Sequence, residues 1–216
     1  MLFSEDPYLI KTTQPRDITI FAAAQLQGKR ERQEDFFLNF NDECVALADG
    51  VGGMPHADVA ARLACETAIW GYKQIRIRNT YWNDRKEFLK RIFRSTNIAV
   101  WQKQREVGYA DGMATTMTVA MVGIRNAWIG AVGDTPAYMF HNTLLRKITS
   151  DDIDREGYLT KIMGRQRYGL VPQVYTLDFI EGDMVFLATD GLTRCVSEQE
   201  MVSILSATGN TLQSVT

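Results

Sequence analysis

Strand-like and helix-like segments are segregated along this chain, and their order limits the folds that it can adopt. Short runs rich in β-branched and aromatic residues come first, two long amphipathic segments follow, and strand-like runs then return. A parallel sheet needs strands that alternate with helices, so this order argues against one. We therefore predict an α+β fold, built as a four-layer α-β-β-α sandwich in which two mainly antiparallel sheets are flanked by helix pairs.

The two long amphipathic segments are expected to form helices. Apolar residues recur at intervals of three and four over 58–75 and again over 84–106, with charged residues between them. This spacing gives each helix one buried stripe and one solvated face, so the aromatic residues are expected to pack in the core. A shorter helix is expected near 200–205, preceded by Ser197 as its N-cap residue.

The strand-like runs are separated by glycines or by short polar turns. The runs at 36–40 and 44–48 flank Asn41-Asp42-Glu43, and this arrangement predicts a β-hairpin. The other expected strands cover 18–24, 115–122, 127–132, 137–140, 171–177 and 184–188.

The overall composition is that of an ordinary globular domain. The 216 residues contain 24 Lys+Arg and 26 Asp+Glu, and the formal net charge is -2. A chain of this length can form an adequate apolar core, and no linker or internal repeat divides it, so residues 1–216 are expected to be a single domain. The balanced charge argues against a nucleic-acid partner, because such proteins usually carry a basic stripe.

No targeting signal is expected, and the cysteines form no recognisable motif. No basic region precedes a long apolar core at the N-terminus, and no stretch is long and apolar enough to span a membrane. We therefore expect a cytoplasmic protein with no membrane partner. Cys44, Cys65 and Cys195 form no Cys-x-x-Cys pair, so we expect neither a zinc site nor a disulfide and interpret all three as buried or half-buried small residues.

Acidic residues occur at the ends of several expected strands. They are Glu34-Asp35 before the strand at 36–40, Asp49-Gly50 after 44–48, Gly133-Asp134 after 127–132, and Asp190-Gly191 after 184–188. A single Asp-Gly pair usually marks only a turn. Because the strand ends of one sheet converge in space, however, four such sets are expected to share a pocket.

A cluster of carboxylates of this kind favours a divalent cation. The carboxylates repel one another in a partly dry site, and a bound cation removes that repulsion. Oxygen ligands without supporting His or Cys favour Mg²⁺ or Mn²⁺ over Zn²⁺. The glycine-rich stretch at 50–53 would let the backbone approach such an ion closely and offer a carbonyl oxygen as a ligand.

Five short segments between Phe21 and Val196 carry a family resemblance when they are taken together and in order. They are GKRERQED at 28–35, ADGVGG at 48–53, GMATT at 112–116, VGDTPAY at 132–138 and ATDGLT at 188–193. This set resembles the motifs of the metal-dependent serine/threonine protein phosphatases of type 2C, the PPM family. Val51 stands where eukaryotic members carry a His, so the chain resembles the bacterial branch.

The resemblance implies a metal centre. Two Mg²⁺ or Mn²⁺ ions would activate a water that hydrolyses phosphoserine and phosphothreonine on proteins. In this sequence Asp49 would bridge the two ions, the carbonyl of Gly50 would bind one of them, and Asp190 would bind the other. Asp134 would help Asp190 to hold a third, weaker ion.

The resemblance also implies the groups that surround the metals and the partners of the protein. Glu34 and Asp35 would hold metal-bound waters. Arg30 would bind the substrate phosphate, which suits its planar fork of donors. The expected partners are phosphorylated protein substrates in a Ser/Thr kinase pathway, and the sequence does not predict the oligomeric state.

The chain also departs from the family pattern. Pro136 replaces the usual Arg, and nothing in the sequence explains this change. The segment from Asp152 to Leu159 is shorter than the corresponding part of the family's flap loop, so the cleft is expected to be more open. Asp151 and Asp152 are expected to lie in a solvated turn. No Asp-Asn follows Asp190, so we expect the terminal strand that would complete the second metal site to be missing and the C-terminal end of the domain to be incomplete.

These departures leave an alternative open. The chain would then be a pseudophosphatase or a phosphoprotein-binding regulatory module with an impaired second metal site. Another two-metal phosphodiesterase or nuclease is disfavoured, because the sequence lacks both His ligands and a basic groove.

Overall fold

A five-stranded antiparallel sheet forms the centre of the computed structural model, which describes residues 9–12, 21–78 and 84–209. Its strands, in spatial order, are β3 (Asp35–Phe40), β4 (Cys44–Asp49), β5 (Met117–Val122), β6 (Asn126–Val132) and β9 (Gln173–Asp178). The β3–β4 hairpin is confirmed, and Asn41 adopts a positive φ of 48° in its turn.

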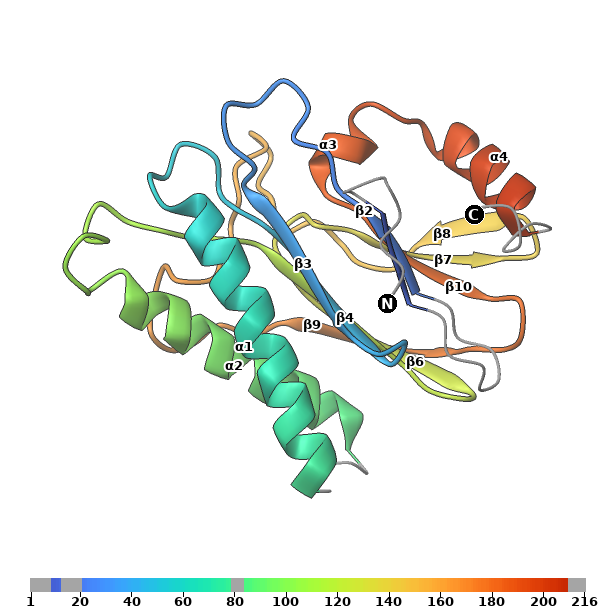
Figure 1. Ribbon diagram of the computed structural model, residues 1–216, viewed down its shortest axis with the longest axis horizontal. Helices are drawn as coiled ribbons and strands as arrows, with labels where there is room; N and C mark the ends of the chain where they lie inside the picture. Colours follow the sequence, from blue (N-terminus) through green and yellow to red (C-terminus); the bar gives the residue numbers. More distant parts are fainter. Residues whose placement is uncertain (1–8, 13–20, 79–83, 210–216) are drawn as a thin grey trace.

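Two helices, α1 (Ala57–Arg78) and α2 (Arg85–Lys103), cover one face of this sheet (Figure 1). The main apolar core lies between them and the sheet, as their amphipathic spacing predicts. Asp84 caps α2, because its side chain accepts a hydrogen bond from the backbone N–H of Glu87 at 3.0 Å. Both predicted long helices are therefore confirmed.

A second, three-stranded sheet packs against the other face. It has the order β10 (Met184–Leu187), β7 (Ala137–His141) and β8 (Leu144–Lys147), and a smaller core that includes Ala120 and Ile129 fills the space between the sheets. The α+β sandwich is thus confirmed.

The outer layer on the second side differs in detail from the expected helix pair. Among the described residues it is formed by α4 (Glu198–Gly209), which contacts β8, and the one-turn helix α3 (Asp190–Thr193) lies beyond β10. Ser197 caps α4 as predicted: its hydroxyl accepts from the N–H of Glu200, and the Glu200 carboxylate accepts from the N–H of Ser197.

The N-terminal part of the chain contributes a separate two-stranded sheet. Its strands are β1 (Leu9–Thr12) and β2 (Phe21–Ala24), which pair in antiparallel fashion. The strand expected at 18–24 is confirmed over β2, and its first residues lie outside the described part. Residues 210–216 also lie outside it, so the expectation about a missing terminal strand stays a prediction.

Two local expectations were incomplete or wrong. Strands β1 and β8 were not predicted, and β8 follows a tight turn in which Asn142 and Thr143 both have positive φ. Cys44 and Cys65 are buried as expected, but Cys195 is exposed, because it follows α3 on the surface. No helix within the described ranges is both long and apolar enough to cross a bilayer.

Candidate active site

The strand ends that carry the predicted acids meet at one end of the sandwich. Antiparallel pairing places Asp35, at the start of β3, opposite Asp49, at the end of β4. It also places the end of β6 beside the start of β5. Residues 133–136 connect β6 to β7, so Asp134 also lies at this end. The first residue of β7 pairs with the last residue of β10, so Asp190, which follows β10, lies at the same end.

The backbone of Asp49 is held by two buried threonines, Thr115 and Thr116, immediately before β5. The Asp49 carbonyl accepts hydrogen bonds from the Thr115 hydroxyl at 2.7 Å and from the Thr116 N–H at 2.9 Å. The Thr116 hydroxyl also bonds the hydroxyl of Thr135, in the loop after Asp134. The sequence interpretation gave these threonines no role, although Thr115 and Thr116 belong to one of the five motif segments.

Gly50 packs against the first residue of α1. A Cβ atom at this position would lie 2.6 Å from the carbonyl oxygen of Ala57, a distance that real Cβ atoms essentially never show. The Gly50 N–H donates to the carbonyl of Glu34 at 3.1 Å. The close approach of α1 therefore requires glycine at position 50. Glu34 contacts Gly50 through its backbone carbonyl.

The carboxyl group of Asp49 lies in a strongly unfavourable environment for its charge. Burial raises its pKa, and the negative charges of Asp35, Asp190 and Asp134 raise it further, to about 8. The structure therefore brings together, as electrostatic neighbours, the four Asp residues that the sequence places at separate strand ends.

Asp35 and Asp134 are affected in the same direction. Burial raises the pKa of Asp35, although a hydrogen bond from the Thr189 hydroxyl at 2.9 Å and the charge of Arg30 counteract it. Burial and then the charge of Asp190 raise the pKa of Asp134, partly offset by its own backbone and by Arg194. The candidate site thus concentrates more negative charge than its protein neighbours neutralise.

Asp190 has a cationic partner that the sequence interpretation missed. It is the first residue of α3, and the guanidinium of Arg194, one turn later, lies 2.7 Å from its carboxylate. The side chain of Asp190 is 31% exposed and that of Arg194 is 70% exposed. The i,i+4 spacing of Asp190 and Arg194 would have indicated this ion pair if the segment had been predicted to be helical, which it was not.

Arg30 lies on the loop that leads into β3. The side-chain amide of Gln27 donates to the carbonyls of Arg30, at 2.8 Å, and Glu31, at 3.0 Å, and so fixes the path of this loop. The guanidinium of Arg30 forms no ion pair with any residue in the described part of the chain. It is therefore available to an external anion beside Asp35.

The donor chemistry of the site fits a hard divalent cation. Within the described residues, no three His, Cys, Asp or Glu side chains converge tightly enough to hold an ion by themselves. Mg²⁺-like ions do not need such a cage, because they usually keep several waters and take only one or two carboxylates. Asp49, Asp190 and the backbone of Gly50 could supply such a partial set. A cation there would offset the burial and the neighbouring acids that raise the pKa of Asp49.

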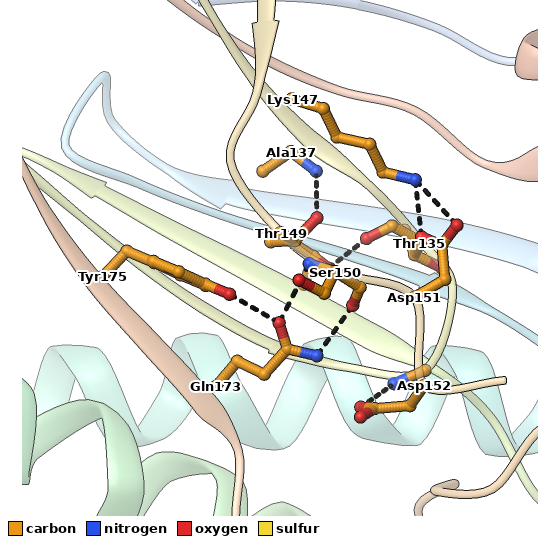
Figure 2. Close-up of polar contacts among 11 residues, drawn as sticks. Thr135, Ala137, Lys147, Thr149, Ser150, Asp151, Asp152, Gln173 and Tyr175 are labelled. Carbon is orange, nitrogen blue, oxygen red and sulfur yellow. Dashed lines mark hydrogen bonds and ion pairs between the residues drawn. The ribbon is translucent and has the colours of Figure 1, made fainter.

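The expectation of a solvated turn at Asp151 and Asp152 is wrong for Asp152. Its side chain, drawn in Figure 2, is nearly buried and accepts from the N–H of Gly133 at 3.1 Å. It also pairs with Lys161 at 2.7 Å. Asp151, in contrast, pairs with Lys147 in a partly exposed position. Asp152 therefore ties the loop after β8 to the loop that carries Asp134.

Further polar contacts fasten the same loop to the sheets. Figure 2 shows the side-chain amide of Gln173, at the start of β9, bonded to both the N–H and the carbonyl of Ser150, while the hydroxyl of Tyr175 donates to the Gln173 oxygen. The Thr149 hydroxyl accepts from the N–H of Ala137, the first residue of β7. The base of the β8–β9 loop is therefore held by both sheets.

Comparison with known proteins assigns the family. The family model described as protein phosphatase 2C matches residues 25–216. The chain therefore belongs to the protein phosphatase 2C family, and the predicted class, a serine/threonine protein phosphatase, is confirmed at this level.

Individual relatives agree with this assignment. The serine/threonine phosphatase stp of Listeria monocytogenes is 26% identical over 185 residues, which cover 77% of this chain and 73% of that protein. The protein phosphatase PhpP of Streptococcus pneumoniae is 23% identical over 201 residues, covering 83% and 80%.

Solved structures show the same fold. The Mycobacterium tuberculosis phosphatase PstP/Ppp matches with a TM-score of 0.67 at 22% identity, covering 81% of this chain and 79% of that one. A structure of the PstP catalytic domain with two manganese ions matches with a TM-score of 0.66 at 24% identity, covering 82% and 78%.

Proposed function

We propose that this chain dephosphorylates phosphoserine and phosphothreonine on proteins by means of a binuclear Mg²⁺ or Mn²⁺ centre at the end of the sandwich. The observation that carries the proposal is the convergence of Asp49, Asp190, Asp134 and Asp35, with the pKa of Asp49 raised to about 8. The PstP structure with two manganese ions, on the same fold, supports it.

We propose the metal-binding roles that the family resemblance implies, and the grouping of the four Asp residues supports them. Asp49 would bridge both ions, the Gly50 carbonyl would bind one, and Asp190 the other, while Asp134 with Asp190 would offer a weaker third position. When bound, such ions lower the pKa of water and neutralise charge on phosphoryl oxygens. The fixed backbone of Asp49 contributes by holding its carboxylate in place before any ligand arrives.

The remaining residues act on the substrate and on water. The fork of N–H donors on Arg30 suits two oxygens of a phosphate, and no described ion pair competes for it. Asp35, fixed by Thr189, would accept hydrogen bonds from ordered water. The water oxygen would bond to phosphorus and release one proton to solvent, while the phosphorus–oxygen ester bond breaks and the seryl or threonyl oxygen takes up one proton from solvent.

The physiological setting that fits this reaction is a cytoplasmic signalling pathway. A Ser/Thr kinase would supply the phosphoprotein substrates that this enzyme consumes. The similarity to the stp and PhpP phosphatases supports phosphoprotein substrates.

Hydrolysis of a phosphothreonine peptide tests the proposal. We expect turnover with Mn²⁺, none with EDTA, and a loss of more than about a hundredfold in Asp49→Asn, which exceeds the usual effect of groups that only support a metal ligand. Asp111→Asn, which changes an exposed acid in another loop, is the matched control and should keep full activity. Equal rates in wild type, EDTA and Asp49→Asn would overturn the mechanism, and Mn²⁺ binding without turnover would favour the phosphoprotein-binding alternative.

A further inference from the structure

A cavity of about 350 Å³ lies in the loop between β8 and β9, and the proposed reaction does not use it. Its lining combines two cations with apolar side chains and contains no acid. The lining residues are Thr160, Lys161, Ile162, Arg165, Gln166, Gly169, Leu170 and Val171. We refer to it below as the loop cavity.

The loop cavity is preformed, because α2 holds its wall. The buried amide of Asn97 donates to the carbonyls of Gln166, at 2.8 Å, and Arg167, at 3.2 Å, and accepts from the N–H of Gly164 at 2.9 Å. Leu170, another lining residue, packs against the main core. A ligand would therefore meet a shaped site and would not have to order the loop.

Two contacts place the loop cavity next to the candidate active site. Met163 pairs with Thr115 through two backbone hydrogen bonds, and Thr115 holds the carbonyl of Asp49. Lys161 pairs with Asp152, which in turn binds the backbone of Gly133, the residue before Asp134. The cavity wall thus begins within two residues of the supports of both Asp49 and Asp134.

Arg165 carries the uncompensated positive charge of the cavity. Lys161 is engaged by Asp152, and the guanidinium of Arg167 stacks outside the cavity on the rings of Trp101, at 5.2 Å, and Tyr168, at 4.9 Å. The exposed side chain of Arg165 forms no ion pair or hydrogen bond with any residue in the described ranges. A carboxylate entering the cavity would be its natural partner.

We propose that the loop cavity binds a glutamate or aspartate side chain of the phosphoprotein substrate, beside the phosphorylated residue. The apolar walls suit the methylene groups of such a side chain, and Arg165 suits its carboxylate. The enzyme would then prefer phosphorylation sites with an acidic flank on one side. This inference rests on the proposed phosphatase activity, because it names the substrates on which that activity acts.

Steady-state kinetics on three phosphothreonine peptides test the inference. The peptides differ only in carrying neutral flanks, glutamates on the amino side, or glutamates on the carboxyl side of the phosphoresidue. We expect one acidic peptide to have a KM about fivefold lower than the neutral one at equal kcat, the upper range for a partly exposed ion pair. Arg165→Gln should remove this difference without changing the kcat for the neutral peptide.

Two further variants separate a specific contact from general electrostatics. Arg155→Gln removes an exposed arginine of the same loop that lies outside the cavity lining, and it should keep the preference. Arg165→Glu should reverse the preference toward a lysine-flanked peptide. Equal KM values for neutral and acidic peptides in wild type would overturn the inference and leave the phosphatase activity standing, whereas no hydrolysis of any peptide would overturn the proposed function itself.

Discussion

The two halves of the candidate metal site are built differently. The first half, Asp49 and Gly50, ends a central strand, and buried threonines and the start of α1 fix its backbone. In the second half, Asp134 lies in the loop between β6 and β7, and Asp190 begins the one-turn helix α3, where it is partly exposed and paired with Arg194.

The first half has a fixed backbone, whereas the second half has a positively charged partner of its own. Asp49 is buried among other acids, so without a cation its charge destabilises the fold. Asp190 has Arg194 as a partner, so it depends less on an external cation, and that cation must compete with the guanidinium. We therefore expect the first half to dominate metal affinity and the second half to tune it.

Replacing Asp49 gives the largest expected effect. The substitution should raise the thermal stability of the metal-free protein and remove the stabilisation that metal gives. Its pKa is raised from 3.8 to about 8, so between these values the folded protein holds a proton that the unfolded chain releases. The metal-free wild type should therefore lose stability as pH rises through this window. Asp49→Asn should melt several degrees higher than wild type at about pH 9 in EDTA, and it should lose the stabilisation that Mn²⁺ gives wild type.

Thermal unfolding with EDTA or Mn²⁺, at about pH 5 and about pH 9, measures both effects. The difference between the metal-free proteins should shrink at the lower pH, where Asp49 is protonated in the wild type. A metal-free wild type whose stability rises steadily from the lower to the higher pH would contradict this account of the first half.

Gly50→Ala tests the rigidity of the first half and should have an intermediate effect. The new Cβ would meet backbone atoms of Ala57, which cannot move aside as a flexible side chain could, so we expect a loss of about 1–3 kcal/mol in unfolding free energy. Gly52→Ala is the matched control: its Cβ would meet nothing within 4 Å, and the change should stay below about 1 kcal/mol. Urea unfolding measures both, and equal losses would show that the packing of Gly50 on α1 is not limiting.

Arg194→Gln tests the counter-charge of the second half and should have the smallest effect. Removing the guanidinium frees the carboxylate of Asp190, so Mn²⁺ should bind about fivefold more tightly at the second half of the site. The gain is modest because Arg194 is mostly exposed. Calorimetric titration measures the affinity, and Arg194→Lys should stay close to wild type. An unchanged or weaker affinity in Arg194→Gln would remove the distinction between the two halves.

The sequence was informative where a feature depends on local periodicity or on the convergence of strands. The spacing of apolar residues predicted α1 and α2, and acids at separate strand ends predicted a shared pocket. The grouping of Asp35, Asp49, Asp134 and Asp190 followed because antiparallel strands return to the same edge. Their roles as metal ligands or water-binding groups stay predictions.

Other features depend on contacts that no local pattern reveals. Asp152 was expected in solvent because adjacent acids are usually solvated, yet it is nearly buried by bonds to Gly133 and Lys161. Strand β8 is short and mostly exposed, so its sequence lacks a strong apolar alternation. Asn97 gave no signal, since a buried amide that holds a distant loop looks in sequence like any polar helix residue.

The hydrogen bond from Thr189 to Asp35 has a consequence for how the protein folds. Asp35 and Asp49 meet within one hairpin, which can close early because it orders few residues. The Thr189 contact joins positions separated by 154 residues, so closing it orders a much longer stretch of chain, and we expect it to form later than the hairpin. We therefore expect the two acids of the hairpin to come together before Asp190 joins them, so that the complete acidic cluster forms late in folding.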